Sequence, residues 1–165
     1  MRRFRVDDGD ALHDALEASR DHLRPYMFWA DQSRDDTRRF AVEAVTDWDE
    51  GRNWNVGIFD TDTGEALGGS GLHPRSGPDV LEIGYWRAVH AGGRGLITAT
   101  AEALTTTAFT NPAIARVEIH CDVTNRASAA VPKRLAYELC GIIDKEPVAP
   151  AETGRQQVWV KGRPA

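Results

Sequence analysis

Apolar residues recur at helical spacing in several parts of the chain. Over 10–19 they fall three and four positions apart, with acidic residues near the start, as in an amphipathic helix. The same spacing predicts helices over about 35–49 and over 96–109. Another helix is expected to begin near Asn125, because Asn is a preferred residue at a helix start. The chain is therefore expected to contain four main helices.

Alternating or continuous apolar runs predict the strands between these helices. Strands are expected over 54–59, 66–72, 80–89, 116–122, 142–148 and 156–160. The turn residues of 60–65 join the first two strands as a hairpin. The stretch 23–30 contains a proline and has no clean period, so it is expected to be a loop or short helix that covers another part of the molecule. Mixed helices and strands predict the α/β class.

Length and composition narrow the class of protein. The chain has 165 residues, which indicates one domain over 1–165, and its 41% hydrophobic and 27% charged residues predict a packed core. No apolar run approaches the roughly 20 residues of a membrane span, and the amino terminus lacks a secretory signal, so a soluble cytoplasmic protein is expected. Cys121 and Cys140 lack a metal-binding spacing, and each is expected to pack as a small apolar residue.

The net charge of −5 is unevenly distributed along the chain. Residues 1–86 hold 10 Lys and Arg against 18 Asp and Glu, net −8, whereas residues 87–134 hold 6 against 3, net +3. An overall deficit of positive charge disfavours a nucleic-acid partner, which needs a broad basic surface. The basic middle segment is consistent either with a small local anion or with solvated surface charges.

The strongest chemical signal is a glycine-rich turn between a predicted strand and a predicted helix. Glycines 92, 93 and 95 allow several backbone N–H groups to converge on one anion, and the helix that follows adds its free N–H groups. Phosphate is the natural ligand of such a turn, although glycines also serve ordinary turns. A Walker loop is absent, and Thr98 stands where a dinucleotide fingerprint needs glycine or alanine.

Two motifs resemble the RimJ/RimL branch of the GNAT-fold N-acetyltransferases. One is Gly84-Tyr85-Trp86 followed by Gly93-Arg94-Gly95-Leu96, and the other is Asn125-Arg126-Ala127-Ser128 leading into Val131-Pro132-Lys133-Arg134-Leu135. The resemblance covers nearly the whole chain and implies a GNAT-type domain, with a mixed, mostly antiparallel sheet flanked by helices and with splayed central strands. His90, where the family has Gln or Arg, and Ala136, where this branch usually has glycine, depart from the pattern.

The resemblance implies acetyl-CoA as the cofactor and requires no metal. The turn would wrap the pyrophosphate, and the pantetheine arm would lie along 83–88 as an added strand. The implied cofactor-binding residues are Trp86, Arg87, Ala88, His90, Ala91, Gly92, Gly93, Arg94, Gly95, Leu96, Asn125, Ser128 and Lys133. Arg94, Lys133 and Arg134 are candidates for pairing with phosphates, or else are solvated surface charges.

The same resemblance assigns catalytic roles. A backbone N–H near Tyr85 or Trp86 would donate to the thioester carbonyl, and Ser128 would act as the acid for the departing thiolate. Asn125 and Ser128 would otherwise be a simple helix cap. Pro132 cannot donate the hydrogen bond that the Ser128 carbonyl would normally accept, which favours a local kink that re-aims the serine.

The general base and the acceptor are left open by the sequence. Glu82 is the first candidate for the base, with Glu118 and His120 as alternatives on one face of a strand. The other candidate histidines are expected on the surface: His13, His22 and His73.

The aromatic residues Tyr26, Phe28 and Trp29 would line the acceptor site. The expected reaction is direct acetyl transfer to a primary amine, either a protein N terminus or a small amine. The alternatives are another acyl group, such as succinyl, or a non-catalytic acyl-CoA sensor. By analogy with the branch, a homodimer is expected, without a nucleic-acid or membrane partner.

Overall fold

A seven-stranded sheet forms the centre of the molecule in the computed structural model, which describes residues 1–164. The strand order is β1-β2-β3-β4-β5-β7-β6. The strands are β1 (Arg2–Arg3), β2 (Trp54–Phe59), β3 (Ala66–His73), β4 (Val80–Arg87), β5 (Arg116–Asp122), β6 (Glu138–Asp144) and β7 (Arg155–Gly162). Within this described part of the chain, only β4 and β5 pair in parallel, and the other neighbours are antiparallel. The expected mixed, mostly antiparallel sheet is confirmed.

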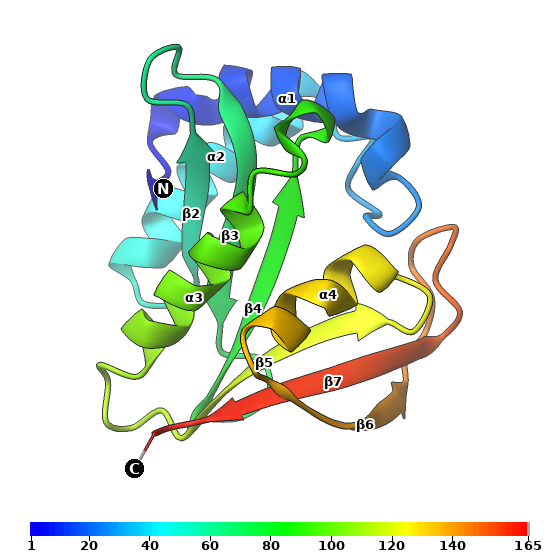
Figure 1. Cartoon of the computed structure of the whole chain (residues 1–165). Coiled ribbons are helices and arrows are strands. Elements are labelled where there is room, and N and C mark those ends of the chain that lie inside the picture. The colour runs from blue at the N-terminus through cyan, green and yellow to red at the C-terminus, as the bar shows by residue number, and fades with distance from the viewer. Residues whose placement is uncertain (165) are drawn as a thin grey trace.

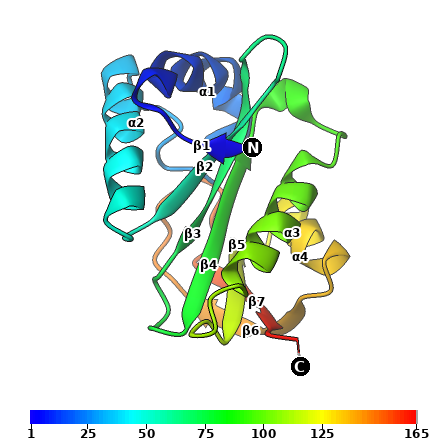
Figure 2. The ribbon, with the colours of Figure 1, turned by 90° about the vertical axis from the view of Figure 1, so that its left-hand side faces the viewer.

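Helices cover both faces of this sheet. The helices are α1 (Gly9–Leu23), α2 (Arg34–Asp49), α3 (Leu96–Ala108) and α4 (Arg126–Arg134), with 3-10 turns η1 (Val6–Asp8) and η2 (Val89–Ala91). Figure 2 shows α1 and α2 on one face and α3 and α4 on the other. A capping box between Ser33 and Asp36 begins α2. No helix within residues 1–164 has the length and apolar character needed to span a membrane.

The two faces of the sheet bury separate apolar clusters. The larger cluster packs β4, β5 and β7 against α3 and α4, and Ile83, Val117 and Ile119 in it are almost completely buried. The smaller cluster joins α1 and α2 to the sheet through residues such as Phe4, Leu12 and Leu16. Burial of this apolar surface is the main favourable contribution to folding, and it holds both helical layers against the strands.

The central strands β4 and β5 separate along their length. They pair only at Val80 to Glu82, opposite Arg116 to Glu118, and beyond these residues β5 is paired with β7 alone. The two strands therefore form a V that opens toward the end of β4 (Figure 1). The backbone of β4 past Glu82 consequently faces an opening on its β5 side, which confirms the expected splayed strands.

The last strands differ from the pattern seen in the sequence. A strand is expected over 142–148, but β6 begins and ends four residues earlier. All seven of its residues are exposed, and its register shifts between Leu139 and Gly141. An edge strand without a buried face leaves no alternation of apolar residues, so the two isoleucines at 142 and 143 marked the expected start of a strand although they lie near its end.

The two cysteines have different surroundings. Cys121 on β5 is buried, as expected, whereas Cys140 on β6 is exposed, so the expectation that it packs as a core residue is wrong. The cause is again the edge position of β6, which has no covering helix.

Candidate active site

The turn between β4 and α3 adopts the backbone conformation that its glycines permit. Gly93 and Gly95 have φ angles of +75° and +72°, in the left-handed region that disfavours side chains. A Cβ added to either residue would meet no atom within 4 Å. Glycine is therefore required at both positions by backbone conformation rather than by packing.

The N–H groups of this turn are free to bind a ligand. Among residues 1–164, no backbone or side-chain acceptor is hydrogen-bonded to an amide from Gly93 to Thr98. The first of these amides lie in the turn, and the last three open the 13-residue helix α3, whose positive dipole end points the same way. Converging free amides at a helix start fit the diphosphate of coenzyme A.

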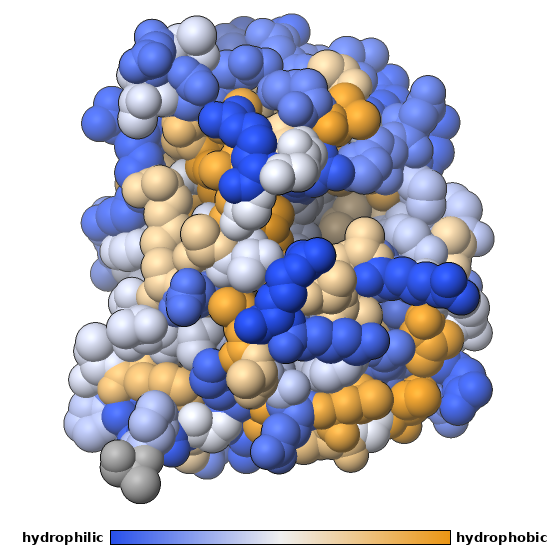
Figure 3. Space-filling view, in the orientation of Figure 1, coloured by the Kyte–Doolittle hydropathy of each residue, from blue (hydrophilic) through white to orange (hydrophobic). Residues whose placement is uncertain are grey.

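A groove of about 760 Å³ begins at this turn. It passes from the start of α3, along the end of β4, to α4, and the space-filling view shows a hollow above α4 (Figure 3). The open backbone of β4 forms one wall of this groove. The phosphate end and the pantetheine arm of the cofactor therefore have a continuous path toward the V between β4 and β5.

Eight of the predicted cofactor residues line this groove. They are Trp86, Arg87, Ala91, Gly93, Gly95, Leu96, Asn125 and Ser128. Arg134 also lines it, together with Ala127 and Val131 on the same face of α4. Lys133 projects elsewhere, because its Nζ lies 5.5 Å from the centre of the Trp159 ring. Arg134 follows Ala127 by two helical turns and so lies on the same face of α4, whereas its neighbour Lys133 lies on another face.

The other predicted cofactor residues lie around the turn rather than in the groove. Ala88 is fully buried, and its N–H donates to the Leu67 carbonyl at 2.9 Å. His90 is exposed, with Nε2 3.1 Å from a carboxylate oxygen of Glu65. Gly92 packs beside the guanidinium of Arg87, and Arg94 is exposed. Their roles toward the cofactor stay predictions.

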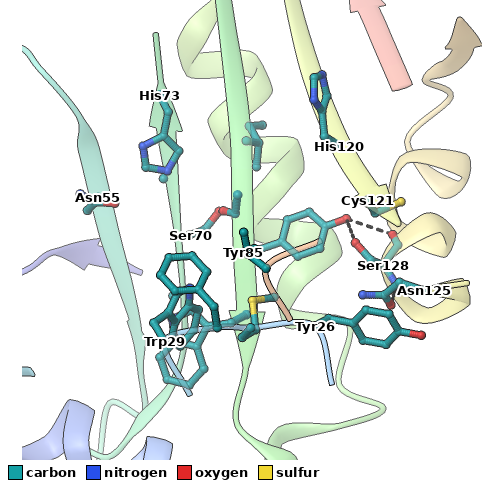
Figure 4. Close-up of a pocket in the computed structure, with 18 of the residues that line it drawn as sticks. Tyr26, Trp29, Asn55, Ser70, His73, Tyr85, His120, Cys121, Asn125 and Ser128 are labelled. Atoms are coloured by element: carbon teal, nitrogen blue, oxygen red, sulfur yellow. Dashed lines mark hydrogen bonds between the residues drawn. The ribbon is translucent and has the colours of Figure 1, made fainter. Parts of the chain in front are cut away.

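Tyr85 and Ser128 meet at the inner end of the groove. The Ser128 hydroxyl donates to the Tyr85 hydroxyl at 3.1 Å, and the Tyr85 hydroxyl donates to the Ser128 carbonyl at 3.0 Å (Figure 4). Burial raises the pKa of Tyr85 well above its ordinary value, against the opposing effect of the Ser128 hydrogen bond. The phenol therefore stays protonated and holds the serine in place.

The proline of α4 explains why Tyr85 can make this contact. Pro132 lies inside the helix and has no N–H to offer the carbonyl four residues earlier. That carbonyl belongs to Ser128 and accepts the Tyr85 hydroxyl instead. The sequence predicted the free carbonyl, and the structure supplies its partner.

A second cavity, of about 420 Å³, meets the groove at this point and lies on the α1 and α2 side of the sheet. The loop after α1 contributes all three predicted acceptor residues, Tyr26, Phe28 and Trp29. Trp29 packs edge-to-face on Trp86, with ring centres 6.0 Å apart, whereas Phe28 is 70% exposed. Tyr26, Tyr85, Trp86, Asn125 and Ser128 line both cavities, so the two spaces share one junction.

Three loops meet across the open end of the V. The Tyr26 hydroxyl lies 3.2 Å from the Thr124 hydroxyl, and the Ala151 N–H donates to the Pro25 carbonyl at 2.8 Å. Asp122 holds the same region by accepting hydrogen bonds from the N–H and hydroxyl groups of Thr124 and Thr153. Together these contacts bound the junction on its outer side.

His73 lines the acceptor cavity, so the expectation that it is a surface residue is wrong. Its Nδ1 lies 2.9 Å from Asn53 Oδ1, while the Asn53 amide donates to Asp47 at 2.8 Å. Burial and, to a smaller extent, the nearby Arg75 charge lower the pKa of His73 to about 4, against the opposing effect of Asp47. The ring is neutral, Nδ1 donates to Asn53, and Nε2 remains an acceptor.

Glycines on β3 let side chains that line this cavity pack directly against the strand backbone. A Cβ on Gly71 would lie 2.9 Å from His73 Nε2 and 2.7 Å from Asn55 Oδ1. A Cβ on Gly69 would lie 2.5 Å from the indole nitrogen of Trp86. The β3 backbone therefore approaches these side chains more closely than any larger residue permits.

The candidate bases lie near one another on β4 and β5. Glu82 accepts from Arg75 at 3.2 Å and does not line the acceptor cavity. Glu118 is buried, and His120 lies beside it and lines the cavity. The remaining expected surface histidines differ, since His22 is exposed and His13 is half-buried.

Part of the cavity could not be seen in the sequence. The loop after β6 contributes Lys145, Val148 and Glu152, and β2 contributes Asn55. Their sequence surroundings carry no motif, and only the chain topology brings them beside β4. Turn residues around 147–151 could have marked the loop but not its position.

Comparison with known proteins agrees with this geometry. Residues 1–138 match the acetyltransferase (GNAT) domain family. A Bacillus subtilis protein named "Putative ribosomal N-acetyltransferase YdaF" is 30% identical over 144 residues, which are 83% of this chain and 76% of that protein. The chain belongs to the GNAT acetyltransferase family, as the two sequence motifs indicated, and it is an N-acetyltransferase that uses acetyl-CoA as its donor.

Solved structures share the fold at lower identity. RimL, a ribosomal L7/L12 alpha-N-protein acetyltransferase solved with coenzyme A, is 22% identical with a TM-score of 0.87, covering 98% of this chain and 92% of that one. The microcin C7 self-immunity acetyltransferase MccE, solved with acetyl-CoA and AMP, is 18% identical with a TM-score of 0.87, covering 97% and 89%. These likenesses confirm the GNAT fold.

Proposed function

We propose that this enzyme acetylates the N-terminal amine of a protein, with a ribosomal protein as the first candidate. The observation that carries the proposal is the junction at Tyr85 and Ser128, where a groove suited to coenzyme A meets a separate cavity on the other side of the sheet. Such an arrangement lets both substrates bind together, so that the acetyl group passes directly between them.

The shape of the acceptor cavity favours a slender chain end. The contacts of Tyr26 with Thr124 and of Pro25 with Ala151 bound the junction, so a folded protein surface cannot reach it. Aromatic walls and the acceptor atom His73 Nε2 suit a short extended peptide whose N–H groups need partners. The names of the relatives YdaF and RimL support a ribosomal acceptor.

In this reaction the acceptor nitrogen attacks the thioester carbonyl carbon while both are held at the junction. The Ser128 hydroxyl donates a proton to the sulfur as the carbon–sulfur bond breaks, and a backbone N–H at Tyr85 or Trp86 supports the developing oxyanion. Tyr85 acts as a positioning residue, because it touches Ser128 through two hydrogen bonds. The exposed turn amides bind the diphosphate.

Product analysis tests the acceptor. The protein is incubated with acetyl-CoA and a panel of ribosomal N-terminal peptides, the same peptides with blocked N termini, lysine-containing peptides and polyamines. Thiol release and an acetyl group on the free N terminus are expected, with no reaction of the blocked peptides. Turnover of polyamines alone would replace a protein acceptor with a small one.

A second arm tests the acyl group and the turnover itself. Replacing acetyl-CoA with succinyl-CoA reports the acyl preference, and faster turnover of the succinyl group would overturn acetyl transfer. Coenzyme A binding without turnover, unaffected by Ser128→Ala, would indicate a sensor. The expected homodimer stays a prediction, which light scattering measures directly.

A further inference from the structure

We infer that His120, oriented by Glu118, is the general base that removes a proton from the acceptor ammonium group. The inference rests on acetyl transfer to an amine and holds for a protein N terminus or a small amine alike. The sequence left Glu82, Glu118 and His120 as candidates, and the surroundings of each one in the structure differ in ways that separate them.

Glu118 fixes the orientation of the imidazole. Its carboxylate accepts hydrogen bonds at 2.9 Å from Arg116 Nε and at 2.9 Å from His120 Nε2. Burial opposes ionisation of Glu118, but the surrounding hydrogen bonds, led by those from Arg116 and His120, together with the His120 charge hold the pKa of the carboxyl below its ordinary value. An ionised carboxylate only accepts, so His120 Nε2 carries the hydrogen, and in the neutral ring Nδ1 has the lone pair.

His120 lies on the acceptor side of the opened strands. The last residues that pair β4 with β5 are Glu82 and Glu118, and His120 follows two positions later, where the V has opened. The next residue, Cys121, points to the opposite face and touches Ser128. His120 therefore faces the acceptor cavity, while the next residue of the strand, Cys121, lies beside Ser128 of α4 (Figure 4).

The other carboxylates near the cavity are occupied. Glu82 is paired with Arg75 at the closed end of the V. Asp122 accepts four hydrogen bonds from two threonines, and Glu152 accepts from the N–H groups of Val148 and Ala149. Asp122 therefore has both oxygens occupied. Glu82 lies outside the lining of the cavity, and Glu152 is tied to its own loop through one carboxylate oxygen.

The remaining ionisable groups have other properties. Besides the carboxylates, those that line the cavity are Tyr26, His73, Arg75, Tyr85, Cys121 and Lys145. The pKa of His73, at about 4, makes it too weak a base for an amine, whose own pKa is about 8. Burial keeps Tyr85 and Cys121 protonated by raising the pKa of each. Arg75 and Lys145 are cations.

The proton balance follows from this placement. The acceptor arrives as R–NH3⁺, and His120 Nδ1 takes one proton to give the neutral amine and an imidazolium. The amine forms the new carbon–nitrogen bond, the carbon–sulfur bond breaks, and the thiol leaves protonated. The second nitrogen proton restores the Ser128 hydroxyl, and the imidazolium releases its proton to solvent. One proton is released for each acetyl group transferred.

Steady-state kinetics with an N-terminal peptide tests the inference in the full-length protein. His120→Gln is expected to lower kcat by about 100-fold or more, with the affinity for coenzyme A unchanged within twofold by calorimetry. The loss should shrink above about pH 8.5, where the peptide amine is already neutral. Added imidazole should restore part of the activity of His120→Ala, which a merely structural role would not allow.

Glu118→Gln tests the positioning role, because it keeps the shape of the side chain but removes the charge. A fall in kcat of about tenfold or more is expected at unchanged coenzyme A affinity, together with an altered acid limb of the pH profile. His13→Gln is the matched control, since that histidine lines neither cavity, and it should retain wild-type kinetics.

The possible outcomes distinguish the role of His120 from that of the other candidate bases, and from a failure of the proposed acetyl transfer. Near-wild-type activity of His120→Gln, or a larger loss in Glu82→Gln with no imidazole rescue at position 120, would overturn the role of His120. If His120→Gln does not fold, His120→Asn and the rescue of His120→Ala decide the same point. Absence of turnover in the wild-type protein would instead remove the proposed function.

Discussion

The cofactor groove and the acceptor cavity are built from different parts of the polypeptide. The groove takes its anion site from free amides of one continuous turn, Gly93 to Thr98, together with the open backbone of β4. The cavity is lined by residues of β2, β3, β4, β5 and β7, of the helices α1, α2 and α4, and of the loops that connect them. The anion-binding turn of the groove is thus encoded locally, whereas the cavity depends on the topology of the whole sheet.

This difference determines which substitutions each site tolerates. A backbone site depends on φ angles, so glycine positions control it and many side chains around it can change. A side-chain site depends on buried polar contacts, such as the one between His73 and Asn53, so it is sensitive to protonation and to single substitutions. The following experiments separate the two cases.

Acidification should affect the acceptor cavity most strongly. In the unfolded chain a histidine has a pKa of about 6.5, whereas burial lowers the pKa of folded His73 to about 4. Between these pH values the unfolded state binds more protons, so the free energy of unfolding falls as pH decreases, by about 3 kcal/mol in total. In denaturant unfolding between pH 7 and pH 4, the His73→Gln variant should not show this loss of stability. The control variant His90→Gln should still show it.

Gly95→Val should weaken the backbone site selectively. A β-branched residue at a φ of +72° costs about 2 kcal/mol, which displaces the turn amides and raises the Kd for coenzyme A about 30-fold by calorimetry. Gly64→Val is the matched control, because Gly64 has a φ of +75°, no neighbour within 4 Å of its Cβ position, and a place in a different turn. Equal loss of affinity in both variants would contradict the role of the turn.

Ser128→Ala tests the junction that the two sites share. Its kcat is expected to fall about tenfold, because a hydroxyl is a weak acid that assists the thiolate without dominating the rate. Tyr85→Phe should give a similar or smaller loss, and the double variant should lose little more, since both hydroxyls act as one unit. Fully additive losses in stopped-flow assays would show that the two groups act independently.

Ala136→Gly should produce the smallest change, and a favourable one. Ala136 follows α4 with a φ of +55°, while the Tyr137 N–H closes the helix end on the Pro132 carbonyl at 3.0 Å. This helix ending prefers glycine, so the substitution should raise the free energy of unfolding by about 0.5 to 1 kcal/mol. Denaturant unfolding measures it, with unchanged coenzyme A affinity expected, and a loss of stability would contradict strain at Ala136.

Most helices and strands could be predicted from the sequence because their buried residues recur at helical or strand spacing. The helix over 96–109 and the strand over 116–122 each have one buried face, and their boundaries agree with α3 and β5 within a residue. β6 is exposed on both faces and β1 has only two residues, so neither strand produces a periodic pattern of apolar residues in the sequence. The edges of the sheet were therefore the least predictable part.

The same limit applies to the site. The glycine turn and Ser128 lie in continuous motifs, and both line the groove. His73 was expected on the surface because nothing in its neighbours reveals that Asn53 and Asp47 lie beside it. Glu82 and His120 follow the same alternation along their strands, so only their contacts in the folded structure distinguish the two candidate bases.

The glycines of β3 fix the positions of side chains that line the acceptor cavity. A Cβ at Gly69 would lie 2.5 Å from the Trp86 indole nitrogen, and a Cβ at Gly71 would lie 2.7 Å from Asn55 Oδ1, so even one methyl group would force these side chains to move. Neither glycine has a side chain that could carry a proton, and neither lines the groove proposed for coenzyme A. Selection on this strand can therefore reshape the cavity by displacing a neighbouring side chain, and so change which amines it admits, while the chemistry of the transfer stays untouched.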